Sequence, residues 1–260
     1  MSLARRIAAG TALAVALAMG PSAHAQFSMT DDFGAEINPQ PPGQHYHSNR
    51  YFTTQLTFGP FRPDVDSEFD GKRSPYANYF GNDRHLLIQV EAAYEIWQKV
   101  GTVSLGLGAG YFSVSGTSPN ANHSGPSSDK STLMVVPVSL SAIYRFDYYL
   151  VRDEFPLVPH AKAGLDWNYW QITDGNGDIA TDSMGGRGRG GTLGWHAAVG
   201  LAIVIDKLDP DAAKDFDTEM GVNHSALVFE FGHYDVSGLG QSNRLHVGDT
   251  TWTAGLLFEF

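Results

Sequence analysis

Alternation of apolar with polar or small side chains constrains this chain most, and the segment from residue 250 to 260 shows it clearly. One face would carry Trp252, Ala254, Leu256, Phe258 and Phe260, and the other Thr251, Thr253, Gly255, Leu257 and Glu259. Successive side chains of a strand point to opposite sides. The segment is therefore predicted to be a strand with one apolar face.

The same alternation recurs in seven earlier segments of the chain. They cover residues 51–58, 86–96, 102–111, 134–146, 160–169, 194–205 and 226–232. None of the eight apolar faces carries a charge, whereas a lipid-facing Lys or Arg at mid-bilayer costs about 2–4 kcal/mol. A soluble β-sandwich would also alternate, so the faces alone do not decide between a sandwich and a membrane barrel.

The connections between these segments favour the barrel. Residues 59–84, 116–131, 173–192 and 236–248 form long connections, and shorter ones lie between them at 98–101, 148–156 and 209–221. Long loops outside and shorter turns inside are typical of transmembrane barrels. The chain is thus expected to be all-β, an up-and-down antiparallel transmembrane β-barrel of about eight strands, closed because every backbone group in lipid needs a partner.

The N-terminal region predicts export. Residues 1–25 have two arginines, a short apolar run and an A-x-A site, which indicate a signal peptide cleaved between Ala25 and Gln26. Residues 26–49 are polar and Pro-rich and are expected to form a disordered periplasmic tail, and residues 50–260 the barrel. The mature chain keeps 15 basic and 28 acidic residues, so nucleic acid is not expected as a partner.

The polar faces define the candidate lumen. The residues expected to line it are Gln89, Glu91, Glu95, Arg145, Lys162, Asp166, Asn168, His196, Glu230 and Glu259. Unpaired buried charges are costly, so Arg145 is expected to pair with an inward carboxylate. Eight strands enclose a space just wide enough for side chains, which favours a filled lumen over a diffusion porin.

Two connections invite specific expectations. Residues 61–69 carry three acids and one proline and could form either a binding surface for an extracellular ligand or a packed lid over the barrel mouth. Residues 209–216 predict a short periplasmic helix, with Asp209 as its cap and Pro210 in its first turn. This helix is expected to cover the periplasmic mouth.

Motifs for chemistry are weak. Residues 186–191 match G-x-G-x-x-G by letter, but a dinucleotide site needs a strand before the motif and a helix after it. Residues 174–178 place oxygens at alternate positions, yet lack the glycine and glutamate of an EF-hand, so a polar turn is favoured over calcium binding. The chain has no cysteine, and its ten histidines show no metal-binding spacing. His224 precedes a serine, but no acid partner is evident from the sequence. No cofactor is expected.

Several motifs together resemble a known family. They are 58–69 (FGPFRPDVDSEF), 144–148 (YRFDY), 156–159 (PLVP), 191–196 (GTLGWH), 222–224 (VNH), 248–252 (GDTTW) and the closing FEF. The chain is similar in these to an outer-membrane β-barrel family known mainly from myxobacteria and related groups. The resemblance implies the fold, location in the bacterial outer membrane and contact with its lipid, but no activity.

The end of the chain points the same way. A terminal aromatic on an apolar-face strand resembles the signal that such barrels present to their assembly machinery, here Trp252, Phe258 and Phe260. The favoured function is a non-enzymatic structural or surface-interaction role. A narrow pore is the alternative, and a lipid-modifying enzyme would need a Ser/His/acid set at the outer membrane interface.

Overall fold

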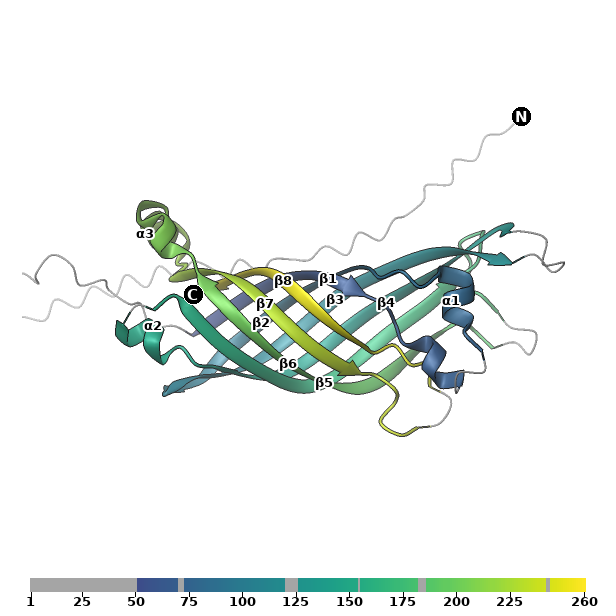
Figure 1. Ribbon diagram of the computed structural model, residues 1–260, viewed down its shortest axis with the longest axis horizontal. Coiled ribbons are helices and arrows are strands. Elements are labelled where there is room, and N and C mark those ends of the chain that lie inside the picture. Colours follow the sequence, from purple (N-terminus) through teal and green to yellow (C-terminus); the bar gives the residue numbers. More distant parts are fainter. Residues whose placement is uncertain (1–50, 70–72, 120–125, 154, 182–185, 242–243) are drawn as a thin grey trace, which may run out of the picture. The chain divides into compact units, whose positions relative to one another are not determined.

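The chain folds into a closed antiparallel β-barrel (Figure 1). The computed structural model describes residues 51–69, 73–119, 126–153, 155–181, 186–241 and 244–260. The signal peptide, its cleavage between Ala25 and Gln26 and the tail at 26–49 lie outside these residues and stay predictions. Among the helices of the described part, none is long and apolar enough to cross a membrane.

Each strand pairs with its successor, and β1 closes the barrel by pairing with β8. The strands of the described residues are β1 (Phe52–Phe61), β2 (His85–Lys99), β3 (Gly101–Pro119), β4 (Pro126–Arg145), β5 (Leu157–Thr173), β6 (Arg189–Val204), β7 (His224–Asp235) and β8 (Asp249–Glu259). The predicted up-and-down barrel of about eight strands is confirmed. We call the end with the β1–β2, β3–β4, β5–β6 and β7–β8 connections the outer end, and the opposite end the inner end.

The outward face of the barrel is strongly apolar. One row runs across four paired strands through Leu107, Leu140, Leu165 and Trp195, which are 63, 56, 58 and 40% exposed. A contiguous apolar surface of this extent would be unfavourable in water. Since closed barrels with an apolar outer band are the transmembrane proteins of bacterial outer membranes, the outward face is the lipid-facing one.

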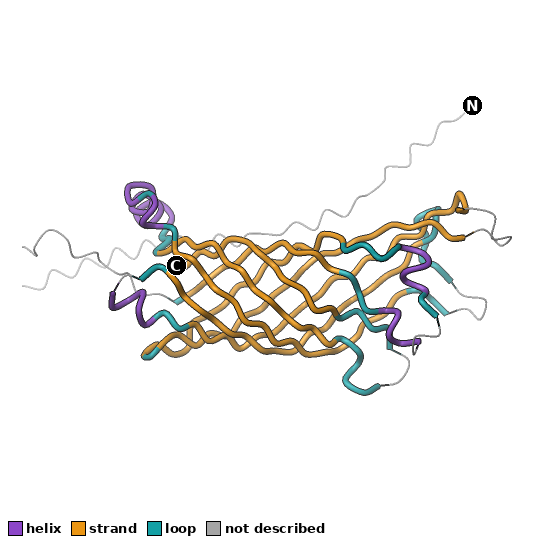
Figure 2. Tube along the Cα trace, viewed as in Figure 1, coloured by secondary structure: helices purple, strands orange, loops and turns teal. Residues whose placement is uncertain are grey.

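The β3–β4 hairpin is longer than the sequence predicts. Residues 116–131 were expected to form a long connection, but β3 continues to Pro119 and β4 begins at Pro126. Figure 2 shows the two strands reaching past the other strands at the outer end. Outside lipid a strand has no need of an apolar face, and pairs such as Ser115 Oγ to Thr132 Oγ1 (2.8 Å) hold it without hydrophobic alternation.

The β1–β2 connection forms a lid over the outer end of the barrel. It contains the 3₁₀ helix η1 (Val65–Phe69) and helix α1 (Pro75–Phe80). The Asp66 carboxylate accepts hydrogen bonds from the backbone N–H groups of Tyr76 (2.7 Å) and Ala77 (3.3 Å) and pairs with Arg62 (2.9 Å). These contacts satisfy donors at the start of α1. Residues 61–69 therefore pack as a lid over the barrel mouth, which is one of the two expectations for them.

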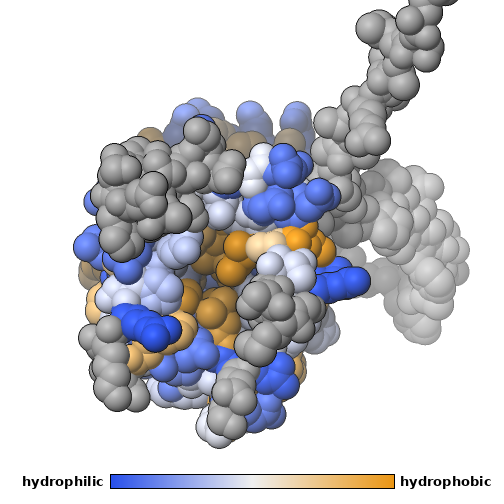
Figure 3. All heavy atoms as spheres, turned by 90° about the vertical axis from the view of Figure 1, so that its right-hand side faces the viewer, coloured by the Kyte–Doolittle hydropathy of each residue, from blue (hydrophilic) through white to orange (hydrophobic). Residues whose placement is uncertain are grey.

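An apolar cluster fills the outer end of the lumen beneath this lid. Its buried members are Phe61, Val65, Tyr76, Leu87, Phe112, Val114, Leu133, Val135, Val236 and Val247. We call this set the outer cluster. Seen from the outer end, hydrophobic side chains lie in the centre of the barrel and hydrophilic ones around the rim (Figure 3). The lid and the strands are therefore held together by a small hydrophobic core of their own.

Two of the three connections at the inner end carry helices. Helix α2 (Tyr148–Asp153) joins β4 to β5, and η2 (Asp206–Leu208) with α3 (Pro210–Met220) joins β6 to β7. The predicted short helix is confirmed. Asp209 accepts a hydrogen bond from Ala212 N (3.1 Å), and Gly221 ends the helix in the left-handed conformation at φ 71°.

The expectation that this helix covers the inner mouth is wrong. Helix α3 packs against η2 and β7 and lies to the side of the barrel rim in Figures 1 and 2. The inner end of the lumen is already filled by a second apolar cluster. This inner cluster consists of Leu150, Val158, Ala202, Val204, Ala226, Val228 and Leu257. Because η2 and α3 connect the neighbouring strands β6 and β7, this connection stays beside the ends of those two strands and does not cross the lumen.

Candidate functional site: the barrel lumen and the outer mouth

Lys162 lies at the centre of the lumen between two carboxylates. Its Nζ is 2.9 Å from Glu230 Oε2 and 3.5 Å from Glu91 Oε1. The second oxygen of Glu230 contacts His160 Nε2 at 2.9 Å. All four side chains are at most 12% exposed. Strands β2, β5 and β7 thus each bring one or two inward residues to a shared, desolvated ion-pair network.

Ser141, His196 and Asp166 continue this network along the lumen. Ser141 Oγ is 3.2 Å from His196 Nε2, and His196 Nδ1 is 2.8 Å from Asp166 Oδ2. The order of groups is that of a serine hydrolase triad. Ser141 Oγ also donates to Glu91 Oε2 at 3.3 Å, so the serine links the triad-like set to the ion pairs around Lys162.

The setting of this set is unlike that of a hydrolase. Ser141 is 1% exposed and faces the lumen rather than the membrane interface. The neighbouring cavity, lined by His196 and Lys162 among others, has a volume of about 20 Å³, which suits one water molecule. An ester or an acyl chain does not fit there. The set therefore acts as a hydrogen-bonded brace between β4, β5 and β6.

A glycine makes room for the histidine ring in this brace. Gly164 faces inward on β5, opposite His196 of β6. A Cβ at Gly164 would lie 2.7 Å from His196 Cε1 and would run into the backbone carbonyl of Leu140. The small residue in the polar face of β5 is thus required by the close approach of the ring.

A second ion pair lies nearer the inner end. Arg145 Nη2 is 3.1 Å from Glu95 Oε1, and both side chains are at most 8% exposed. Arg145 also donates to Thr53 Oγ1 (3.2 Å) and Ser104 Oγ (3.3 Å). The carboxylate that accompanies Arg145 in the lumen is therefore that of Glu95, on β2.

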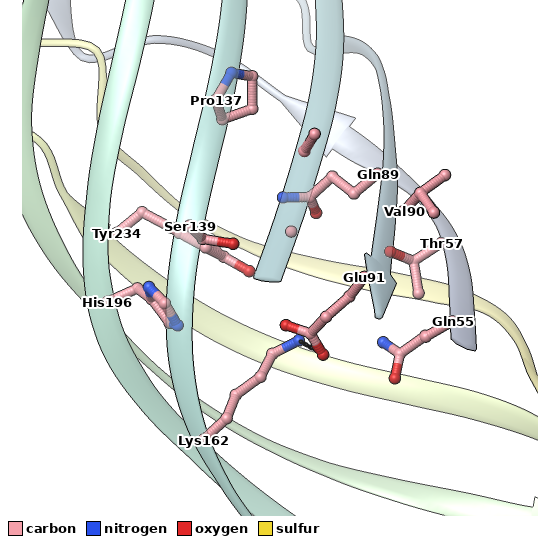
Figure 4. A pocket seen from close by; sticks show the side chains of 12 residues that line it. Gln55, Thr57, Gln89, Val90, Glu91, Pro137, Ser139, Lys162, His196 and Tyr234 are labelled. Atoms are coloured by element: carbon pink, nitrogen blue, oxygen red, sulfur yellow. Dashed lines mark ion pairs between the residues drawn. The ribbon is translucent and has the colours of Figure 1, made fainter. Parts of the chain in front are cut away.

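The lumen is filled along its length. Figure 4 shows the side chains from β1, β2, β4, β5, β6 and β7 that converge around the 20 Å³ cavity. A second cavity of about 10 Å³ lies among residues that include Thr53, Glu91 and Arg145. The outer cluster covers this polar zone at one end and the inner cluster at the other. Among the described residues, the polar zone of the lumen thus contains water-sized spaces separated by paired charges, with apolar side chains at both ends.

The residues that the sequence predicts to line the lumen do face inward. Glu95, Arg145, Asp166, Asn168, His196, Glu230 and Glu259 are buried, Glu91 and Lys162 are nearly so, and Gln89 lines the 20 Å³ cavity. The structure brings together Glu91, Lys162, Glu230, Asp166 and His196. Sequence reasoning missed His160 and Ser141 as their partners. Both lie on the polar face of their strands, but the sequence does not reveal which inward residues of different strands stand at one level.

The aromatic residues at the chain end occupy the positions expected of them on β8 and beyond it. Trp252 is 56% exposed on the outward face, and Phe258 shares that face. Phe260 pairs through its backbone with Phe52 (2.8 Å), and the two rings are 6.2 Å apart. Contact with an assembly machinery stays a prediction.

Three weaker sequence motifs have structural explanations. Residues 189–191 of the Gly-rich motif belong to β6 and are followed by strand, not helix, and Gly191 gives space to the Trp167 ring. In residues 174–178, Asp174 Oδ1 accepts hydrogen bonds from Asn176 N and Asp178 N, both 3.0 Å, as in a polar turn. No cluster of metal-ligating side chains occurs in the described ranges.

His224 does have an acid partner, contrary to the sequence-based expectation. Its Nδ1 is 2.6 Å from Asp206 Oδ2, and Asp206 Oδ1 accepts a hydrogen bond from Ser225 N (2.9 Å). The partner lies in η2, on the far side of α3 in the sequence. The pair fastens the start of β7 to the end of β6.

An open cleft of about 550 Å³ lies at the outer end, between the lid and the β7–β8 connection. Its polar lining includes Asp64, Ser67, His233, Asp235, Ser237 and His246. Asp249 supports one wall by binding the Arg84 guanidinium (2.5 Å) and the backbone N–H of Arg62 (3.0 Å). This cleft is of the size of small-molecule sites, whereas the lumen cavities are not.

Burial at the lid also changes the acidity of a tyrosine. The Tyr76 side chain is 1% exposed, and this burial raises the pKa of its phenol to about 12, against a partial lowering by the Arg62 guanidinium. The Arg62 guanidinium lies 5.2 Å from the centre of the Tyr76 ring. The phenol is therefore neutral in the folded lid at ordinary pH.

Comparisons with known proteins found only distant structural likenesses. No protein-family model and no curated protein matches this sequence. Among solved structures, Neisserial surface protein A is 14% identical with a TM-score of 0.43, and the match covers 82% of this chain and 98% of that one. OprG from Pseudomonas aeruginosa is 13% identical with a TM-score of 0.43, covering 82% and 97%. A major outer membrane protein from Thermus thermophilus is 13% identical with a TM-score of 0.41, covering 82% and 100%.

These likenesses are distant, and the features that identify the protein are its own. They are the eight antiparallel strands closed by β1 and β8 and the large apolar side chains exposed on the outward face. The chain is an eight-stranded β-barrel protein of the bacterial outer membrane.

Proposed function

We propose that this protein is a non-conducting barrel that anchors a surface for interaction at the outside of the cell. The filled lumen is the observation that carries this proposal. The charges around Lys162 are paired, and the cavities among them hold about one water each. Apolar clusters lie at both ends of this zone. Ions would have to break buried ion pairs and cross apolar layers to pass.

Planar-bilayer recording tests the proposal. The mature chain is folded into bilayers, and insertion is verified by its heat-dependent gel mobility. We expect no stable current steps from inserted protein. Stable single-channel steps that change with Glu91→Gln or Asp166→Asn would contradict the proposal and favour a narrow channel. The observation that favours this alternative is the continuous series of polar contacts from Asp166 to His160.

The outer cleft is the proposed site of surface interaction. Carboxylates, imidazoles and hydroxyls between them donate and accept hydrogen bonds to hydroxyl groups, so the lining of Asp64, His233, Asp235 and His246 suits a polyhydroxylated ligand such as an oligosaccharide. An oligosaccharide array probed with the folded protein tests this. Binding that is lost in Asp64→Asn/His246→Gln and kept in Asp209→Asn, at the inner end, would support the site. Binding that is equal in both variants would contradict it.

Two narrower inferences belong to the same proposal. Sequence motifs such as those at residues 58–69, 191–196 and 248–252 support kinship with the barrel family known mainly from myxobacteria and related groups. The exposure of Trp252 on the outward face of β8 supports recognition of Trp252, Phe258 and Phe260 by the barrel assembly machinery. Replacing Phe260 with Ser and measuring the amount of heat-modifiable barrel in the outer membrane tests the second point, with a reduced amount expected and an unchanged amount contradicting it.

A further inference from the structure

Helix α3 presents an apolar stripe that nothing in the described residues covers. Ala212, Phe216 and Met220 recur at intervals of four and so share one helix face. Phe216 is 44% and Met220 65% exposed, and Leu208 in the preceding η2 is 84% exposed. The other side of the helix carries Asp211, Lys214 and Thr218, and the acids Asp215, Asp217 and Glu219 flank the stripe.

The position of α3 corresponds to the periplasmic surface of the outer membrane. The helix lies beside the rim of the barrel at its inner end, not below the opening (Figure 1). It follows β6 and precedes β7, whose outward residues Val199, Leu227 and Phe229 are 62, 40 and 48% exposed and face lipid. The helix therefore adjoins the lipid-facing belt where that belt ends.

We propose that α3 is an interfacial helix that lies in the periplasmic leaflet, with Phe216 and Met220 inserted at the boundary of headgroups and acyl chains. Amphipathic helices bind membranes in this way through their apolar face. Most carry basic residues, but α3 has four acidic residues and one lysine. Electrostatic attraction to anionic lipid is absent, so the structure assigns it to a zwitterionic surface such as one of phosphatidylethanolamine or phosphatidylcholine.

Fluorophore accessibility tests this placement, and the absence of cysteine from the chain makes single labels straightforward. Ala212→Cys and Thr218→Cys place an environment-sensitive dye on opposite sides of α3, and both native residues are exposed. Neither change removes Phe216 or Met220. The full mature chain is folded into phosphatidylcholine vesicles, with nitroxide lipids as the membrane quencher and Co²⁺ on both sides as the aqueous quencher.

We expect the dye at residue 212 to be quenched at least threefold more by nitroxide lipid than the dye at residue 218, and the reverse for Co²⁺. Adding Leu208→Ser, Phe216→Ser and Met220→Ser should abolish this difference while the barrel stays heat-modifiable. Replacing half of the phosphatidylcholine with anionic phosphatidylglycerol should weaken the quenching of the dye at residue 212 by nitroxide lipid, because α3 is acidic. Equal Co²⁺ quenching at both positions would overturn the proposal, as would stronger lipid contact in anionic vesicles.

Discussion

Lys162 determines how the charges of the lumen are balanced. It is the cation shared by Glu91 and Glu230, and its burial means that no solvent replaces it. Buried ion pairs contribute little net stability compared with apolar residues, but removing one partner leaves an uncompensated charge. Loss of Lys162 is therefore expected to destabilise the barrel mainly through the unpaired carboxylates that it leaves, and less through the energy of its own contacts.

Replacing Lys162 with Met should lower the free energy of unfolding by about 3–5 kcal/mol, because two carboxylates would lose their common partner. Urea unfolding of the barrel in lipid vesicles, followed by tryptophan fluorescence, measures this. Lys130→Met on the exposed part of β4 is the matched control and should change stability by less than about 0.5 kcal/mol. Equal stability of the two variants would show that the lumen charges are not coupled as described.

Tyr76 connects the lid to alkaline stability. Its folded-state pKa of about 12 lies above the ordinary value of 10, so the protonated phenol favours the folded lid. This contribution is complete below pH 10 and is lost as the pH rises from 10 through 12. Its hydroxyl is buried without a hydrogen-bond partner in the described residues.

Tyr76→Phe should therefore keep the stability at pH 8 or increase it slightly, since it removes an unpaired buried hydroxyl. It should also remove the tyrosine ionisation near pH 12 from the absorbance titration at 295 nm and reduce the loss of stability between pH 10 and 12. Loss of an ionisation near pH 10, rather than near pH 12, would contradict the burial of this phenol.

The elements at the outer end act together as lid, hairpin and cluster. Helix α1 packs against β3, and the approach is so close that a Cβ at Gly116 would clash with the backbone carbonyl of Tyr79. The hairpin thus supports the lid from the side, while Asp66 holds the start of α1. The lid is expected to loosen as a unit when either support is lost.

Gly116→Ala should undock α1 and increase the rate of proteolysis within residues 59–84 several-fold, because the backbone of Tyr79 cannot move aside without drawing the lid away from the cluster. Limited proteolysis of the folded barrel in vesicles measures the rate. Lys130→Ala, at an exposed position of the same hairpin, should leave it unchanged. An unchanged rate in Gly116→Ala would mean that the lid does not depend on the hairpin.

Much of the barrel, but less of its interior, could be predicted from the sequence. Lipid enforces an uncharged face on each strand, so residues such as Leu107 and Leu140 show their orientation locally. The outer ends of β3 and β4 do not, because Phe112, Val114, Leu133 and Val135 are apolar and face inward, and the alternation is lost there. The meeting of Ser141, His196 and Asp166 depends on the register between three strands, which no local pattern encodes.

The molecule as a whole has two properties: its outward face contacts lipid, and the described residues of its lumen leave no path for water. These two properties can be tested separately because adjacent residues of one strand face opposite environments. Ser139 lines the central cavity, Leu140 is 56% exposed to the outside, and Ser115 lies on the exposed part of the hairpin. A serine-to-cysteine change at Ser139 or Ser115 is nearly isosteric.

The most direct test is the reaction of Ser139→Cys with a membrane-impermeant maleimide in the folded, vesicle-inserted barrel. We predict no labelling at residue 139 from either side until the barrel is unfolded, and rapid labelling of Ser115→Cys under the same conditions. Labelling of Ser139→Cys at a rate close to that of Ser115→Cys would show that water reaches the centre of the barrel, and would contradict a sealed lumen.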